Sequence, residues 1–172
     1  MPSDVVAASV ITEGGVQPAV HLGVAADPAA LHTWARAMCD ERWPHWSRSY
    51  SGVIAVVAGW HRRVGIDVEV LHRPAPPSWS IDDEDFRSAI MTPDERKQLL
   101  TLHDADARAA AVSLWCSKEA LAKALGTPMH MDPARLTGPA AWGDEVRGGW
   151  HARRMDATVL DCDGVAWLVY ES

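Results

Sequence analysis

The stretch of sequence that decides the fold reads Val64-Gly65-Ile66-Asp67-Val68-Glu69-Val70. Side chains alternate along a β-strand, so the aliphatic residues share one face, while Gly65, Asp67 and Glu69 share the other. The aliphatic face belongs in a core, and the two carboxylates lie about 7 Å apart on the opposite face. The glycine beside them has no side chain that would block a ligand. We predict a strand over residues 64–70 whose acidic face is either solvated or neutralised by a cation.

A long helix further along the chain carries a second group of ionisable residues. It is predicted over residues 106–125, because Gly126 follows as a helix stop. At 100° per residue, Trp115, Glu119 and Lys123 lie one turn apart on one face. Alone, Glu119 and Lys123 would be an ordinary surface pair worth about 0.3–0.5 kcal/mol. Facing the strand acids, they would suit a hard divalent ion that bridges carboxylates and phosphates. The core stripe of this helix is predicted to be Ala110, Leu114, Ser117, Leu121 and Leu125.

The remaining elements indicate an α+β fold. Thr92 and Glu95 have the spacing of a capping box, so a helix is expected to begin there. Other helices are expected from Asp27, with Pro28 at the first helical position, to about residue 40, and just after Asp82. Strands are predicted over 5–11, 16–24 and 53–58, an irregular stretch over 42–51, a proline loop over 73–77, and a closing hairpin of strands 158–160 and 165–170.

The composition is that of one globular domain of 172 residues, 48% of them hydrophobic. The sum of 16 basic and 23 acidic residues, −7, argues against a sequence-independent nucleic-acid binder. Three widely spaced cysteines indicate neither a disulfide framework nor a zinc site. No Lys or Arg precedes Arg36, and no apolar run approaches the ~20 residues of a membrane span. We therefore expect a cytoplasmic protein with no nucleic-acid or membrane partner.

Both groups of residues together resemble the two-part signature of the 4'-phosphopantetheinyl transferases. The first part is Gly65-Ile66-Asp67, and the second is Trp115-Cys116-Ser117-Lys118-Glu119-Ala120-Leu121-Ala122-Lys123. They occur in the order and at the separation that the family shows. Glu69, two residues after Asp67, resembles the surfactin-synthetase-activating type rather than the small trimeric holo-acyl-carrier-protein synthases. The helix start at Thr92 also looks like that of the family.

The resemblance implies a reaction and a role for each matching residue. The family transfers the phosphopantetheine arm of coenzyme A to a serine of a carrier protein. By resemblance, Asp67, Glu69 and Glu119 would hold Mg²⁺, and Glu119 would accept the serine proton. Lys118 and Lys123 would neutralise charge on the phosphates of coenzyme A. Charge stabilisation of this kind supplies most of the catalysis in phosphoryl transfer.

The chain departs from the family pattern in its first half. Two-lobed members carry Ser-His-Ser-Gly shortly before the Gly-Ile-Asp strand, and the histidine grips coenzyme A. Here the sequence is Ser49-Tyr50-Ser51-Gly52, so a phenol that can donate one hydrogen bond replaces the histidine. Tyr50 and Ser51 are expected beside coenzyme A, and Arg63 is a candidate for the missing positive charge.

The sequence therefore predicts one 4'-phosphopantetheinyl transferase-like α+β domain over residues 1–172. Its two pseudo-symmetric halves, each a small sheet with packed helices, would be an abbreviated half at 1–63 and a second half at 64–172. The favoured function is Mg²⁺-dependent phosphopantetheinyl transfer to an acyl or peptidyl carrier protein. The alternative is a repurposed member that binds a carrier protein or its pantetheine arm without transferring it. An unrelated binding module with solvated acids is a third reading, which the two-part motif disfavours.

Overall fold

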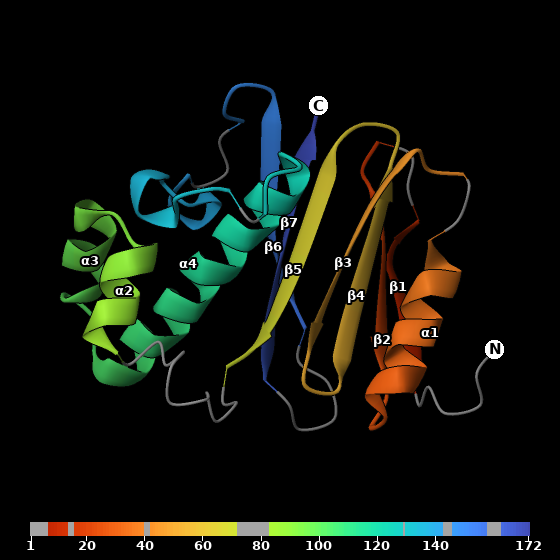
Figure 1. Cartoon of the computed structure of the whole chain (residues 1–172), viewed down its shortest axis with the longest axis horizontal. Helices are drawn as coiled ribbons and strands as arrows, with labels where there is room; N and C mark the ends of the chain where they lie inside the picture. The colour runs from red at the N-terminus through yellow and green to blue at the C-terminus, as the bar shows by residue number, and fades with distance from the viewer. Residues whose placement is uncertain are drawn as a thin grey trace.

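Two antiparallel sheets form the centre of the molecule, with helices on their outer sides (Figure 1). The computed structural model describes residues 7–13, 16–39, 42–71, 83–128, 130–142, 146–157 and 163–172. Within these ranges the strand orders are β1-β2-β4-β3 and β5-β7-β6. The elements are β1 (Ala7–Glu13), β2 (Ala19–Val24), α1 (Pro28–Met38), β3 (His45–Ser51), β4 (Ile54–Trp60), β5 (Val64–Val70), α2 (Glu84–Ile90), α3 (Pro93–Leu99), α4 (Asp104–Ala124), η1 (Pro133–Arg135), η2 (Pro139–Ala141), β6 (Trp150–Asp156) and β7 (Gly164–Glu171).

The main core lies between the two sheets. The aliphatic face of β5 contributes Val64, Ile66 and Val68, all at most 5% exposed. They pack against the inward side chains of β2 and β4, such as Leu22 and Val56. The period-two pattern of residues 64–70 is therefore explained by burial of one face of β5, as predicted.

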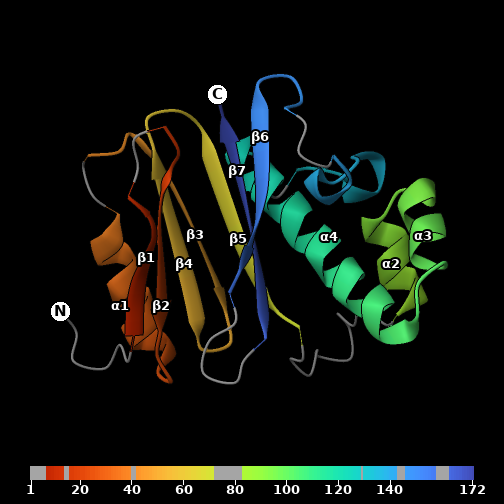
Figure 2. The ribbon, with the colours of Figure 1, turned by 180° about the vertical axis from the view of Figure 1, so that it is seen from behind.

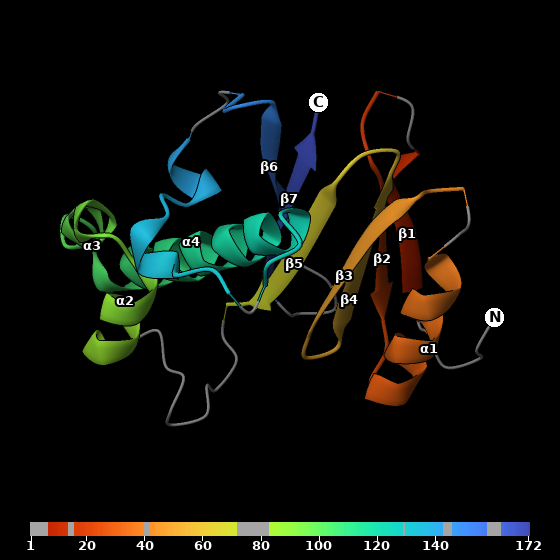
Figure 3. The ribbon, with the colours of Figure 1, turned by 45° about the horizontal axis from the view of Figure 1, so that its top comes forward.

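Helices cover the outer faces of both sheets (Figure 2). On the first sheet, α1 begins at Asp27, whose side chain accepts a hydrogen bond from the amide of Ala29, and it buries Trp34. On the second sheet, α4 buries Leu121 and Ala124 against β7. In the tilted view, α1 lies at one end of the molecule and α2 and α3 at the other, with the two sheets and α4 between them (Figure 3).

Most predicted elements are confirmed, and the exceptions have clear causes. The α+β class and β5 agree with the prediction, and α3 carries the predicted capping box of Thr92 and Glu95. The irregular stretch predicted at 42–51 is wrong, because β3 lies there with serines facing inward. In the described residues β7 pairs with β5 and β6, and the predicted strand at 158–160 lies outside the described ranges. Leu125 follows α4 and is 37% exposed, so its predicted place in the core is wrong.

The sequence predicted no membrane-spanning segment, and the length and polarity of the helices test this. None of the helices in the described ranges is both long and apolar enough to cross a bilayer. The longest, α4, spans 21 residues and contains buried Ser117 and Lys118.

Candidate active site

The distance between β5 and α4 is set by Gly65. A Cβ built on Gly65 would overlap the backbone carbonyl of Ala120 and press on the amide of Ala124. Backbone atoms cannot move aside as a flexible side chain can, so only glycine permits this packing. The space beside Gly65, predicted from the sequence to admit a ligand, is filled by the backbone of α4. This close packing places the acidic face of β5 directly beside the face of α4 that carries Glu119 and Lys123.

Asp67 and Lys123 form the central ion pair of this junction. The ammonium nitrogen of Lys123 lies 2.7 Å from Oδ1 of Asp67. It also lies 3.3 Å from the carbonyl oxygen of Ile66. Asp67 is 4% exposed, and its Oδ2 is buried and accepts no hydrogen bond from the described residues. One oxygen of this carboxylate is thus fully engaged, while the other is unsatisfied, which costs free energy in a folded protein.

Glu119 lies within electrostatic range of this pair. Burial raises the pKa of Glu119, and the negative charge of Asp67 raises it further, while Lys123 partly opposes the change. Two carboxylates near one lysine therefore carry excess negative charge. A half-buried glutamate with a raised pKa is a stronger base than an exposed one, which suits proton transfer near neutral pH.

Glu69 projects from the same strand face but has its own partner. Ser51 Oγ donates a hydrogen bond of 3.0 Å to Glu69 Oε2. Buried Cys116 lies close to both strand acids: burial chiefly raises the pKa of its thiol, and Asp67 and Glu69 raise it further. The thiol is therefore a neutral neighbour of the acidic face rather than a nucleophile.

The donor set fits magnesium in its chemistry. Mg²⁺ prefers oxygen ligands and commonly uses one or two carboxylates together with substrate phosphates. Asp67 offers a buried oxygen that receives no hydrogen bond from the described residues, and the pKa of Glu119 responds to the charge of Asp67. Within the described residues, no group of three or more His, Cys, Asp or Glu side chains is assembled for a metal ion. Asp67 and Glu119 thus lie within electrostatic range of each other, and convergence of both with Glu69 on one ion stays a prediction.

A pocket opens beside Lys123, at the junction of the two halves. Its volume is about 340 Å³, and its lining includes His45, Trp46, Arg63 and Lys123. Trp46 is 45% exposed, and the Arg48 guanidinium lies 5.2 Å from the centre of its ring. The two cations of the lining, Arg63 and Lys123, and the exposed indole of Trp46 suit a phosphorylated aromatic ligand. Two larger pockets, of about 530 and 470 Å³, lie along α3 and α4 and are lined by none of the predicted site residues.

Arg63 lines this pocket but is already engaged. Its guanidinium makes two hydrogen bonds, of 3.1 and 3.0 Å, to the carboxylate of Glu171. It also lies 4.7 Å from the centre of the Trp150 ring. These contacts fix Arg63 at the pocket rim, where its remaining N–H groups could meet a phosphate.

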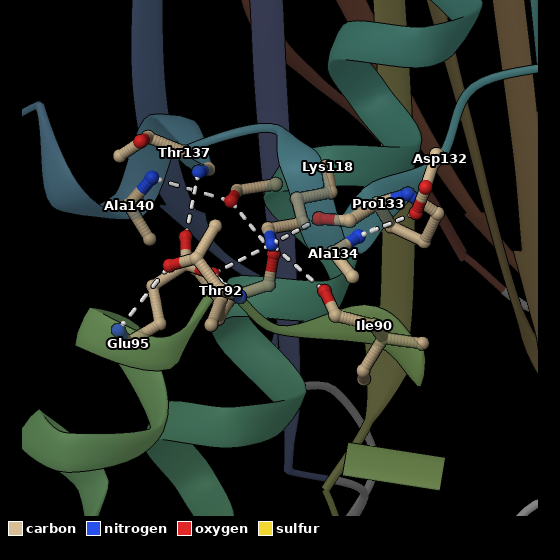
Figure 4. A network of polar contacts seen from close by, with 12 residues as sticks. Ile90, Thr92, Glu95, Lys118, Asp132, Pro133, Ala134, Thr137 and Ala140 are labelled. Atoms are coloured by element: carbon tan, nitrogen blue, oxygen red, sulfur yellow. Dashed lines mark hydrogen bonds and ion pairs between the residues drawn. The ribbon is translucent and has the colours of Figure 1, made fainter. Parts of the chain in front are cut away.

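Lys118 does not join the site. Its side chain is fully buried and donates to Glu95 Oε2 at 2.6 Å and to the carbonyls of Ile90 and Pro133 at 2.7 Å each (Figure 4). An ammonium has three N–H donors, and all three are used here. The role of phosphate ligand assigned to Lys118 by resemblance is therefore corrected to a structural one. Glu95 completes the network by accepting hydrogen bonds from the amides of Thr92 and Gly138.

Tyr50 also lies apart from Asp67 and Lys123. Strand alternation turns Tyr50 away from Ser49 and Ser51, toward α1, where its ring centre is 4.1 Å from that of His32. Its hydroxyl is buried and has no hydrogen-bond partner among the described residues. Burial chiefly raises the pKa of this phenol. The resemblance implied that Tyr50 and Ser51 both lie beside coenzyme A. In the structure the two side chains instead point to opposite sides of β3.

Sequence reasoning missed the serines of β3 as part of the site. Ser49 Oγ donates a hydrogen bond of 2.6 Å to Asp67 Oδ1. The alternation of Ser47, Ser49 and Ser51 was a usable signal for a strand face, but apolar periodicity is the usual criterion and these residues are polar. The place of Lys118 could have been anticipated, since it lies roughly 100° from Glu119 around the helix, whereas Lys123 lies roughly 40° from it.

Comparison with known families agrees with this geometry. The model of the 4'-phosphopantetheinyl transferase superfamily matches residues 63–153, over half of the chain. The chain therefore belongs to the 4'-phosphopantetheinyl transferase superfamily. The matched segment contains Asp67, Glu119 and Lys123 but not β3. A search of curated proteins found no match, and the surfactin-synthetase-activating subtype stays a prediction.

Proposed function

We propose that this protein transfers the 4'-phosphopantetheine arm of coenzyme A to a serine hydroxyl of an acyl or peptidyl carrier protein. The observation that carries the proposal is the grouping of Asp67, Glu119 and Lys123 where β5 meets α4, with Lys123 also lining the pocket. Membership of the superfamily supports this class of reaction. The Mg²⁺ requirement and the identity of the carrier belong to the proposal alone.

In this reaction the serine oxygen attacks the phosphorus that bears the pantetheine arm. The new P–O bond replaces the bond to the other phosphate of the pyrophosphate, and 3',5'-ADP leaves. The proton of the serine hydroxyl moves to Glu119. This glutamate suits the task because burial and Asp67 raise its pKa, which strengthens it as a base.

Binding of coenzyme A is assigned to the pocket at the junction of the halves. Lys123 and Arg63 supply positive charge for the phosphates, and the indole of Trp46 offers a face for the adenine ring. Lys123 is tethered to Asp67 at 2.7 Å, so it is held at the boundary between the pocket and the acids. Mg²⁺ bound by Asp67 and Glu119 would neutralise charge on the pyrophosphate in the transition state.

The test is mass spectrometry of an apo carrier protein incubated with the protein, coenzyme A and Mg²⁺. We expect the carrier to gain the mass of one phosphopantetheine group, and to gain nothing when Glu119→Gln replaces the wild type. Glutamine keeps the shape but loses the negative charge and the basicity. Modification by Glu119→Gln at the wild-type rate would show that another group is the base.

The same assay distinguishes transfer from binding alone. A carrier that binds the protein in calorimetry, yet stays unmodified with coenzyme A and Mg²⁺ present, would support the repurposed binder instead. We favour transfer because the acids and the lysine of the second half are assembled at one junction.

A further inference from the structure

Strands β3 and β5 are edge strands of different sheets, and serine side chains join them. Ser47, Ser49 and Ser51 lie on one face of β3, and they are 8%, 7% and 1% exposed. We call these three residues the serine seam. Buried hydroxyls need hydrogen-bond partners, and within the described part of the chain the hydroxyls of the serine seam bond to residues of β5.

The three hydroxyls of the serine seam bond to two kinds of group on β5, backbone amides and side-chain carboxylates. Ser47 Oγ accepts a hydrogen bond of 3.1 Å from the amide of Ile66, and among the described residues no bond from it to an acid is found. Ser49 Oγ instead donates to Asp67 Oδ1 at 2.6 Å, a short charge-assisted hydrogen bond. Ser51 does both: its Oγ accepts from the amide of Val70 at 3.1 Å and donates to Glu69 Oε2 at 3.0 Å.

The two serine–acid bonds share one register. Ser49 and Asp67 are 18 residues apart, and so are Ser51 and Glu69. The serines therefore advance along β3 as the acids advance along β5, and the two strands run in the same direction. A strand of the first half therefore holds both carboxylates of the Gly-Ile-Asp-Val-Glu stretch in place.

The bond from Ser49 also decides which oxygen of Asp67 is used. Ser49 and Lys123 both donate to Oδ1. Oδ2 is then left buried without a donor among the described residues. A carboxylate that is held by one oxygen cannot rotate freely, so its second oxygen keeps one orientation. Such fixing by an outer partner is how metal-binding carboxylates are commonly oriented.

We infer that Ser49 and Ser51 are positioning residues that orient Asp67 and Glu69 for the Mg²⁺–pyrophosphate complex. The inference rests on the proposed function and adds that the site is completed by β3, which lies outside the matched segment of residues 63–153. A purely structural seam would join the two halves and leave cation binding untouched.

The experiment measures Mg²⁺ binding by calorimetry in the presence of saturating coenzyme A. We expect Ser49→Ala to weaken Mg²⁺ binding about tenfold, since loss of an outer-shell partner costs roughly 10- to 100-fold in metal affinity. Ser51→Ala should weaken it less, because Glu69 has a longer hydrogen bond. Ser49→Thr keeps the hydroxyl and should restore most of the affinity.

Ser47→Ala is the matched control, because it removes a buried hydroxyl from the same strand face without touching an acid. Unfolding in urea should show similar losses of stability for Ser47→Ala and Ser49→Ala, while only Ser49→Ala loses Mg²⁺ affinity. Equal Mg²⁺ affinity in Ser49→Ala and wild type, or an equal loss in Ser47→Ala, would overturn this inference alone. Absence of Mg²⁺ binding in the wild type with coenzyme A would overturn the proposed function, and the inference with it.

Discussion

Gly65 on β5 and Ala120 on α4 are in such close contact that no side chain fits between them. The contact brings Asp67, two residues after the glycine, within reach of Lys123, three residues after the alanine. The glycine of the signature is thus a packing residue: it sets how near the helix that carries the base and the lysine lies to the strand that carries the acids.

Replacement of Gly65 by alanine should therefore disrupt both packing and function. The added methyl group overlaps backbone, so α4 must move away from β5, and we expect a loss of about 3 kcal/mol in the free energy of unfolding. Gly126→Ala is the control, since its Cβ meets nothing within 4 Å and only backbone strain at φ 73° is added, about 1–2 kcal/mol. Urea unfolding measures both; equal losses would mean that the close approach has no special cost.

The buried pair of Lys118 and Glu95 should matter for stability rather than for coenzyme A. Lys118→Met leaves the Glu95 carboxylate buried without its cation, at a cost of about 3–5 kcal/mol. The double variant Lys118→Met/Glu95→Gln removes both charges and should recover much of that loss. Isothermal calorimetry on the double variant should give coenzyme A affinity close to wild type, and a loss beyond about tenfold would restore Lys118 as a phosphate ligand.

Lys123 should behave in the opposite way. Lys123→Met removes a charged hydrogen-bond donor from the pocket, which is worth about 1.5–3 kcal/mol and corresponds to roughly ten- to a hundredfold in coenzyme A affinity. Lys97→Met is the matched control, because Lys97 is exposed on α3 and the change in net charge is the same. Similar affinities for the two variants would show that the phosphates lie elsewhere.

The raised pKa of Glu119 predicts a particular dependence on pH. Transfer needs the carboxylate form, so the rate should fall as pH drops through the pKa of Glu119, which burial and the charge of Asp67 raise. The folded state binds this proton more tightly than the unfolded state, so the contribution of Glu119 to stability is lost as pH rises through that pKa. Glu119→Gln should therefore be inactive and yet more stable than wild type at neutral pH, by about 0.5–1 kcal/mol. Lower stability of Glu119→Gln in urea at neutral pH would contradict this.

Substitution of Tyr50 tests whether this residue of β3 contributes to coenzyme A binding. Its hydroxyl is buried without a partner in the described part of the chain, so Tyr50→Phe should raise the free energy of unfolding by about 1 kcal/mol. Coenzyme A affinity should stay within about twofold, because the ring faces His32 and α1. A marked loss of affinity in calorimetry would instead place a phosphate beside this phenol.

The sequence predicted the second half of the molecule better than the first, for a physical reason. In β5 the apolar residues alternate and face the core, so period and burial agree. In β3 the inward face is made of Ser47, Ser49 and Ser51, while Trp46 on the other face is exposed. The inward residues of β3 are polar because they form hydrogen bonds to the other sheet. Such long-range partners cannot be predicted from the local period of apolar residues.

In the candidate site, too, some features follow from local sequence and others depend on distant segments. The proximity of Glu119 and Lys123 follows from helical spacing alone, and their approach to Asp67 follows from Gly65, whose role could be misjudged without the fold. The burial of Lys118 depends on Ile90, Glu95 and Pro133, which come from three other segments. No pattern within residues 115–123 specifies those partners.

The serine seam also has a consequence for association with other chains. An unpaired strand edge is a template on which a foreign strand can add, and proteins block such edges to avoid aggregation. β3 and β5 would each present such an edge, but each shields the other, and the hydroxyls of Ser47 and Ser51 engage the amides of Ile66 and Val70. The outer edges of the two described sheets are then β1 and β6. Loss of all three serines would therefore be expected to lower solubility, by opening two strand edges in the middle of the molecule.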